Sequence, residues 1–184
     1  MHRFLLGLFG AIALTLSAST PTVAQPAARD GRPANLVEAF RAANIAEVYI
    51  IRRDIEFAVT PTAGTVRTLG CRYVFNRRSR AWDELEAALQ DVEFQADEER
   101  RWLPGVRLGL LLGDDRGSLF EVYARWPQES EAFVPGFVER RSARISARFA
   151  AALEGVTLSH PENLVRTESP MRLCPSGAAE TERR

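Results

Sequence analysis

The chain has 184 residues, and its 24 basic residues balance its 24 acidic residues, so its formal net charge at pH 7 is zero. Nucleic-acid-binding domains carry a strong excess of basic charge, so this balance argues against a nucleic-acid partner. All 24 basic residues are arginine. Arginine binds carboxylate and phosphate bidentately, but codon bias in a GC-rich genome is the favoured explanation, because Ala, Gly and Pro are frequent too.

The first 24 residues have the pattern of a cleavable secretory signal. A basic start at Arg3 is followed by an apolar run over residues 4–16, and Thr22-Val23-Ala24 supplies the small residues of a cleavage site. A membrane-spanning helix needs about 20 apolar residues, so a permanent anchor is the less favoured alternative. We therefore expect a periplasmic or secreted protein that starts near Gln25 and has no integral membrane span after cleavage.

Two helices are predicted in the first half of the mature chain. Residues 25–34 lack apolar periodicity and are predicted to be a flexible N-terminus. Asn35 can cap a short helix, and Ser79 can cap a second one. Each carries apolar residues at helical spacing, namely Leu36, Val37, Phe40 and Ala43 on the first and Trp82, Leu85, Leu89 and Val92 on the second.

Two strands are predicted between these helices. Residues 47–59 are rich in β-branched and aromatic residues and predict a strand with a kink or bulge at 52–54. Residues 60–64 predict a turn because they contain Pro and Gly between threonines. Residues 65–75 then predict a second strand, with Cys71 on one of its faces.

The most regular pattern lies in residues 106–126 and predicts a β-hairpin, after a charged stretch at 93–104 that predicts a helix end and a loop. Apolar residues alternate in both arms, at Val106, Leu108, Leu110 and Leu112 and at Phe120, Val122, Ala124 and Trp126. Opposed residues share a face, so even-numbered residues must pair with even-numbered ones. This pairing requires a loop of odd length, either 114–116 or 114–118.

A long helix is predicted from Phe137 or Val138 to Gly155, which is a natural helix terminator. At about 100° per residue, one face carries Val138, Ser142, Ile145, Phe149, Ala152 and Leu153. The opposite face of this helix would carry Arg140, Arg141, Arg144 and Arg148. Residues 156–175 predict an extended tail, and residues 176–184 a disordered one.

The order of these elements predicts a single α+β domain over residues 35–175. Short connections between consecutive strands favour antiparallel pairing, so we expect one antiparallel sheet of about four strands with two or three helices on one face. The predicted core contains Leu108, Leu110, Phe120, Val122, Ile145 and Phe149.

Cys71 and Cys174 are the two cysteines of the chain. In an exported protein an even number of cysteines favours a disulfide, so we predict that these two are bonded. On the chain-entropy argument, a closed loop of about 100 residues is worth about 4–5 kcal/mol. No C-x-x-C spacing points to redox chemistry, and the mature chain has too few Cys and His for a typical zinc site, so we expect no metal and no cofactor.

Sequence motifs for catalysis are scarce. His160 is the one histidine after the predicted signal, so a Ser-His-acid triad would have to use it, but no G-x-S-x-G elbow presents a serine. Asp114 and Asp115 are adjacent and lack calcium-loop spacing, which favours a turn. A carboxylate pair, as in glycosidases, cannot be chosen from 24 acidic residues. We therefore assign no catalytic residue.

Two arginine clusters are candidate surfaces for an anion or a partner. One comprises Arg77, Arg78 and Arg80 before the second predicted helix, and the other comprises Arg140, Arg141, Arg144 and Arg148. Either could face anionic lipid or an acidic partner, although a solvated face neutralised by nearby acids is the simpler interpretation.

These observations favour an exported, non-catalytic binding or accessory protein of the bacterial cell envelope, such as an inhibitor, an immunity-type protein or an assembly factor. Its partner would be another envelope or secreted protein. A small secreted hydrolase that uses His160 or a carboxylate pair is the alternative.

Overall fold

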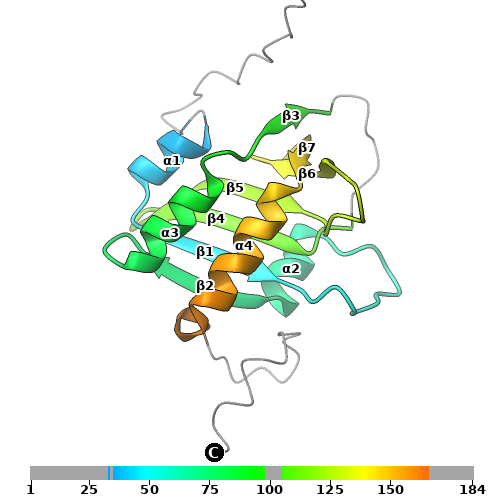
Figure 1. Ribbon diagram of the computed structural model, residues 1–184, viewed down its shortest axis with the longest axis horizontal. Helices are drawn as coiled ribbons and strands as arrows, with labels where there is room; N and C mark the ends of the chain where they lie inside the picture. Colours follow the sequence, from blue (N-terminus) through cyan, green and yellow to red (C-terminus); the bar gives the residue numbers. More distant parts are fainter. Residues whose placement is uncertain (1–32, 34, 98–104, 166–184) are drawn as a thin grey trace, which may run out of the picture.

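The computed structural model describes residues 33, 35–97 and 105–165. Seven strands form one antiparallel sheet in the order β2-β1-β4-β5-β6-β7-β3 (Figure 1). The strands are β1 (Ile45–Ile50), β2 (Cys71–Asn76), β3 (Phe94–Ala96), β4 (Leu108–Asp114), β5 (Gly117–Ala124), β6 (Phe133–Val138) and β7 (Arg141–Ser146). The helices are α1 (Leu36–Ala42), α2 (Ala63–Leu69), α3 (Arg80–Leu89) and α4 (Arg148–Ser159), with a 3-10 turn η1 (Pro161–Asn163). The α+β class and the single antiparallel sheet are confirmed, but the sheet has seven strands rather than about four.

Several predictions lie outside the described residues. These are the signal over residues 1–24, the tail over 176–184, Cys174 and nearly all of the N-terminal segment 25–34. None of the helices within the described ranges is long and apolar enough to cross a membrane.

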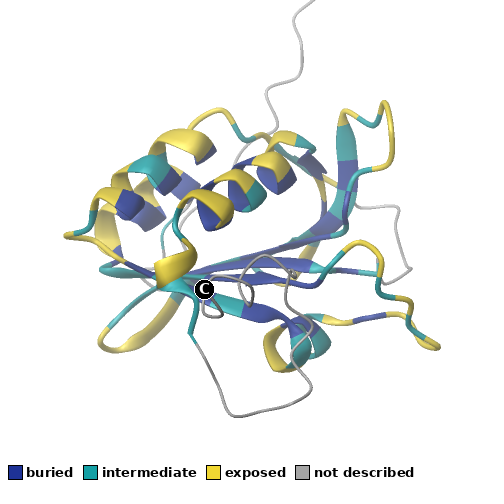
Figure 2. Ribbon diagram, turned by 60° about the horizontal axis from the view of Figure 1, so that its bottom comes forward, coloured by how far each residue is buried: buried dark blue, intermediate teal, exposed yellow. Residues whose placement is uncertain are grey.

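The main core lies between the sheet and α1, α3 and α4, which cover one of its faces (Figure 2). The six predicted core residues, Leu108, Leu110, Phe120, Val122, Ile145 and Phe149, are all buried. A second, smaller core lies on the other face, where Val66 of α2 packs with Tyr49, Leu111 and Tyr123. The expectation that all helices cover one face is therefore wrong for α2.

The predicted capping residues are confirmed. The side chain of Asn35 accepts the backbone N–H of Glu38 at 2.9 Å, and the hydroxyl of Ser79 accepts that of Trp82 at 3.2 Å. These bonds fix the starts of α1 and α3. The apolar sides of both helices then pack together, with Phe40 and Trp82 in an edge-to-face contact at 5.2 Å between ring centroids.

The β4–β5 hairpin is confirmed, but its loop is not. Leu108 pairs with Ala124 and Leu112 with Phe120, so even residues oppose even residues in the arms. The register then shifts, and Asp114 pairs with Gly117. The pairing thus skips one residue of β5 at a β-bulge next to Leu112. This extra residue replaces the loop of odd length that the sequence predicts.

The sequence predicts that residues 65–69 begin the second strand, and this prediction is wrong. Thr62 and Thr65 form a reciprocal capping box, in which each side-chain oxygen accepts the backbone N–H of the other residue. The box starts α2, and Gly70 ends it by donating its N–H to the carbonyl of Val66 at 2.9 Å. Local capping therefore outweighs the β-branched composition of this segment.

The predicted strand over 47–59 ends early, because β1 stops at Ile50. The following loop is held by Arg107, whose guanidinium donates to the carbonyls of Arg52 and Ile55. Ile55 and Phe57 alternate as in a strand, but they pack against the second core as loop residues.

The predicted helix over 137–155 is wrong in its first half. Residues 133–146 form the β6–β7 hairpin, and α4 begins at Arg148 and continues through Gly155 to Ser159. Gly155 has no left-handed backbone and does not end the helix. The four predicted arginines are therefore divided between the turn at Arg140, the strand β7 and the first turn of α4.

The segments predicted as loop and tail also contain paired backbone. Phe94–Ala96 forms β3, which pairs with β7 at one edge of the sheet. At the other edge, Leu164 bridges to Tyr73, and Val165 donates its N–H to the carbonyl of Arg72 at 2.8 Å. The chain after α4 thus returns to the outer side of β2.

Candidate functional site

The turn of the β6–β7 hairpin has an uncommon backbone. Val138 pairs with Arg141, so the loop consists of Glu139 and Arg140. Their φ angles are 49° and 65°, in the left-handed region. Two-residue hairpins favour this geometry, but usually with Asn or Gly in both places. Backbone strain of this kind is often retained where a residue has a function.

Hydrogen bonds to β5 hold the turn in place. The backbone N–H of Glu139 donates to the carbonyl of Glu121 at 2.9 Å, and the Glu139 carboxylate accepts the backbone N–H of Glu121 at 2.6 Å. The acidic side chain at the turn is thus directed to the sheet, and Arg140 is presented on a fixed backbone.

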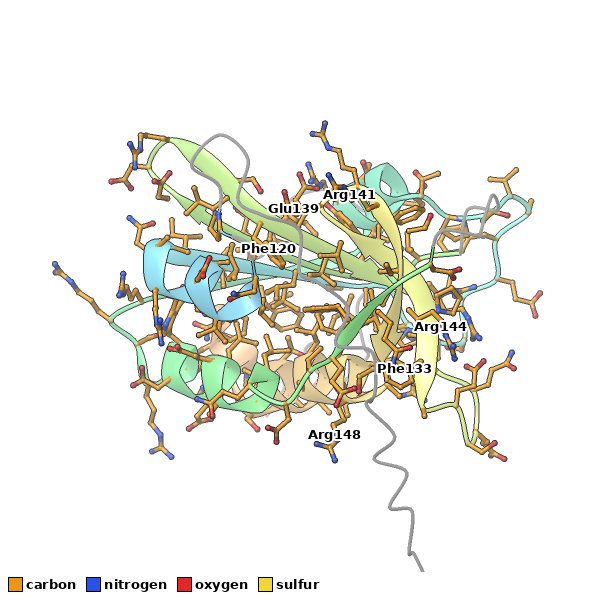
Figure 3. The ribbon with its side chains drawn as sticks, turned by 90° about the horizontal axis from the view of Figure 1, so that it is seen from above. Phe120, Phe133, Glu139, Arg141, Arg144 and Arg148 are labelled. Atoms are coloured by element: carbon orange, nitrogen blue, oxygen red, sulfur yellow. The ribbon has the colours of Figure 1, made fainter. Side chains whose placement is uncertain are left out.

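Three of the predicted arginines lie on this hairpin, and we call Arg140, Arg141, Arg144, Phe133 and Pro135 together the hairpin surface. Arg144 shares one face of the sheet with Phe133 and Pro135, whereas Arg141 pairs with Val138 and lies on the opposite face near the turn. Figure 3 shows Arg141 near the turn and Arg144 beside Phe133 farther along β7. The Arg144 guanidinium lies 5.6 Å from the centroid of the Phe133 ring. None of these three arginines forms an ion pair with a described residue, and all three are exposed.

Most other described arginines are neutralised. Those with a carboxylate partner are Arg52, Arg53, Arg67, Arg72, Arg80, Arg116, Arg125 and Arg148. Three carboxylates near this hairpin already have partners: Glu139 accepts the backbone N–H of Glu121, Glu121 binds Arg67 at 2.6 Å, and Glu131 binds Arg125. Among the residues that the structure describes, no carboxylate is therefore paired with Arg140, Arg141 or Arg144.

The remaining predicted arginines do not join this surface. Arg148 begins α4 and faces Asp91 at 3.7 Å, on the side of the helices (Figure 3). Arg77 donates to the carbonyls of Arg41 and Ala43 at 2.9 and 3.3 Å, which closes the C-terminal end of α1. Arg78 is exposed.

Arg80 pairs with Glu84 within its own helix at 2.8 Å. The cluster of Arg77, Arg78 and Arg80 is thus partly structural, because two of its three side chains already have partners.

His160 is held between two carboxylates. Its Nε2 lies 2.7 Å from Glu84 on α3, and its Nδ1 lies 2.9 Å from Glu162 on η1. Both hydrogen bonds raise the pKa of His160, with that to Glu84 contributing most. A triad needs one ring nitrogen directed at a nucleophile. Both ring nitrogens of His160 are instead bonded to carboxylates, and the bond to Glu84 connects the C-terminal end of α4 to α3.

A polar network that the sequence analysis missed covers part of the α2 face of the sheet. Arg72 and the Tyr49 hydroxyl both donate to Glu47, the latter at 2.6 Å. Burial would raise the pKa of Glu47, but the hydrogen bonds from Tyr49 and Arg72 outweigh it and hold the pKa below its usual value. The alternation of polar residues in β1 could have indicated this face.

Arg67 extends the network from α2 to β5, where it bonds the Tyr123 hydroxyl and Glu121. Burial raises the pKa of both Tyr49 and Tyr123 to about 12, so both phenols are neutral hydrogen-bonding groups at physiological pH. Arginines and carboxylates are paired within the network, and its evident role is to fasten α2 to the sheet.

Two surface pockets are small. One of about 200 Å³ lies between α4 and the loop after β1, where Arg53 stacks on Trp126 at 4.3 Å and pairs with Glu154 at 3.0 Å. The other, of about 140 Å³, lies between α1 and α3. Sites for small molecules usually enclose about 300–1,000 Å³. Each pocket therefore fits a side chain better than a complete ligand.

Asp114 and Asp115 lie in the β4–β5 turn, as predicted. The Asp114 carboxylate accepts the backbone N–H of Arg116 at 2.8 Å, which is a turn contact. The part of the chain that the structure describes contains no group of three or more His, Cys, Asp or Glu residues arranged to hold a metal ion. Comparison with known protein families, with curated proteins and with solved structures gives no match.

Proposed function

We propose that the chain is an exported, non-catalytic binding protein of the cell envelope, and that the hairpin surface is its binding site. The single observation that carries this proposal is that one hairpin bears three exposed arginines, none of which is paired with a carboxylate of the described residues. Arg is enriched where binding energy concentrates in protein interfaces. A turn that keeps Glu139 and Arg140 in left-handed backbone also supports a role beyond folding.

The test compares partner binding by two triple variants. The mature protein is used to capture partners from its own envelope, and the affinity of each identified partner is then measured with purified components. Changing Arg140, Arg141 and Arg144 to Gln should weaken this affinity at least about tenfold, because each charge-assisted hydrogen bond is worth about 1.5–3 kcal/mol.

The control variant changes Arg78, Arg80 and Arg116 to Gln, which removes the same charge from other exposed positions. Its affinity should stay within about twofold of the wild type if the hairpin surface is the site. Equal affinities for the wild type and the hairpin variant would refute the proposal.

His160 gives a test of the hydrolase alternative. His160→Ala should leave partner affinity unchanged, because its ring is bonded to Glu84 and Glu162 away from the hairpin surface. A reproducible hydrolytic rate against an ester or peptide panel that disappears in His160→Ala would instead establish an enzyme.

A further inference from the structure

The loop between β1 and α2 presents five consecutive residues, 56–60, whose backbone is unpaired within the described part of the chain. Residues 51–62 connect the two elements and extend away from the sheet (Figure 1). No backbone hydrogen bond among the described residues involves residues 56–60. Their N–H and C=O groups are strong hydrogen-bonding groups that are therefore open to a second molecule.

Both ends of this loop are held by the segment that precedes β4. The N–H of Ile51 donates to the carbonyl of Arg107 at 2.8 Å, and the N–H of Val106 donates to the carbonyl of Pro61 at 3.2 Å. Because Val106 and Arg107 are adjacent in the chain, the loop begins and ends at nearly the same place. Compact surface loops whose ends meet in this way often carry function.

Side chains hold the middle of the loop. Ile55 and Phe57 pack against the second core, and the Arg107 guanidinium lies 5.2 Å from the centroid of the Phe57 ring. The same guanidinium donates to the carbonyl of Ile55. At the start of the loop, Arg53 pairs with Glu154 of α4 at 3.0 Å. The loop is therefore ordered before a partner binds, which reduces the conformational entropy that binding costs.

The tip of the loop exposes one large apolar side chain. Val59 is 76% exposed, more than Leu158 or Val37, the other large apolar residues exposed in the described ranges. Its neighbours Ala58 and Thr60 are also exposed and carry small side chains. The tip thus offers a partner a single aliphatic group, and its burial would favour binding through the hydrophobic effect.

These features match the substrate cleft of an endopeptidase. Such a cleft binds the main chain of a peptide and takes one side chain into a pocket that sets specificity. A sheet edge also binds main-chain groups, but it requires a straight strand, and this chain bends at Ala58 and Val59. The bend leaves Val59 projecting from the loop, where a pocket can enclose it.

We infer that residues 56–60 form an inhibitory loop that occupies the substrate cleft of an endopeptidase with a small aliphatic pocket, and that Val59 enters this pocket. This inference goes beyond the proposed function, because no residue of the loop belongs to the hairpin surface. The bound loop excludes the peptide substrate from the cleft, while the bonds to Val106 and Arg107 keep its two ends in place.

The experiment measures how the full mature chain inhibits three serine endopeptidases that differ in this pocket. Elastase has a small pocket, chymotrypsin has a larger hydrophobic one, and trypsin has one that contains an aspartate. Small chromogenic peptide substrates report the remaining activity of each enzyme. We expect competitive inhibition of elastase that is at least about tenfold tighter than inhibition of the other two.

A substitution at the tip tests the role of Val59. Val59→Arg should weaken inhibition of elastase at least about tenfold and create inhibition of trypsin, because the trypsin pocket binds a guanidinium. Val37→Arg is the matched control, since it makes the same change at an exposed valine of α1. Its inhibition of both enzymes should stay within about twofold of the wild type. Thermal unfolding of both variants confirms that they are folded.

A second variant tests the support of the loop. Arg107→Gln removes the guanidinium that contacts Ile55 and Phe57. Its inhibition of elastase should weaken, because a looser loop loses more conformational entropy on binding. Cleavage by elastase within residues 56–60, followed by mass spectrometry, should be faster than in the wild type.

The outcomes separate this inference from the proposed function. Absence of elastase inhibition, rapid cleavage of the wild-type loop without inhibition, or equal inhibition of elastase by the wild type and Val59→Arg would each overturn the inference. The variant of Arg140, Arg141 and Arg144 keeps the loop unchanged and should inhibit elastase as the wild type does. Loss of the native partner by that variant, with no inhibition of elastase by the wild type, would support the proposed function alone.

Discussion

Arg140 occupies a backbone conformation that suits glycine better than arginine. A left-handed φ costs a side-chain-bearing residue about 1–2 kcal/mol, and glycine gives back part of that gain through its freer unfolded state. Arg140→Gly should therefore raise the free energy of unfolding by up to about 1 kcal/mol. The same change should weaken partner binding, because it removes a guanidinium of the hairpin surface.

Chemical denaturation and a binding titration on the same sample measure the two effects. Stability that rises while affinity falls is the expected pattern for a residue kept for function. A destabilised Arg140→Gly variant would show that the turn is relaxed with Arg in place and that Arg140 is not strained.

His160 links folding stability to pH. Its pKa is raised in the folded protein, so its stabilising contribution is complete below the ordinary value of 6.5 and is lost as the pH rises through the raised value. The pKa values of Glu84 and Glu162 are lowered, so their contribution is lost as the pH falls through those values. Arg80 also faces Glu84.

We expect the stability advantage of the wild type over His160→Gln to shrink as the pH is raised above 6.5. Urea unfolding at a series of pH values measures this difference. Parallel curves for the two proteins over the whole range would contradict a raised pKa of His160 in the folded protein.

At the level of elements, Gly136 shows how closely β5 and β6 approach. A Cβ at this position would lie 2.2 Å from the carbonyl oxygen of Tyr123 and 2.5 Å from Cδ1 of Ile145. The backbone oxygen belongs to the neighbouring strand and cannot move without loss of pairing. Gly136→Ala should destabilise the protein by about 1–3 kcal/mol through overpacking.

The control is Gly155→Ala, where a Cβ meets no atom within 4 Å and helix propensity favours Ala. Thermal unfolding of the two variants should move in opposite directions. A neutral Gly136→Ala would mean that β5 and β6 are less tightly paired than the structure shows.

The success of the sequence predictions differed between elements for physical reasons. The β4–β5 hairpin was predictable because strict alternation and the Asp and Gly residues of its turn agree. The β6–β7 hairpin was hidden because its turn, Glu139-Arg140, contains no Gly, Asn or Pro. Ile145 in β7 and Phe149 in α4 are both buried, and they are four residues apart, which is a helical spacing.

The candidate site was predictable in its residues but not in its geometry. The cluster of arginines was visible in the sequence, yet the side on which each one lies depends on whether the segment has a period of 2 or 3.6. The network of Glu47, Tyr49 and Arg72 joins residues from two strands, and only the pairing register brings them together. Neither feature follows from local pattern.

On the scale of the whole molecule, the predicted disulfide would connect the chain after α4 to the sheet. Cys71 is buried at the start of β2, and the neighbouring Arg72 accepts the N–H of Val165. Cys174 lies outside the described residues, but nine further residues can span about 30 Å, so it can reach Cys71. We expect a bond between Cys71 and Cys174.

Peptide mapping without reduction should identify this cross-link, and reduction should lower the stability by up to about 4–5 kcal/mol. Cys174→Ser provides the control, because its stability should not respond to a reductant. Two thiols that both react with alkylating agents, or bridges between molecules only, would contradict the prediction.

The two residues that bridge to β2, Leu164 and Val165, have a consequence for solubility. An edge strand offers unpaired N–H and C=O groups that a strand from another chain can use as a template. Val165 occupies part of this edge by its bond to Arg72, and at the opposite edge β3 is only three residues long. A folding intermediate in which α4 has formed but Leu164 and Val165 have not yet docked would expose β2. Early docking of Leu164 and Val165 would therefore protect a folding chain from edge-to-edge pairing with another chain.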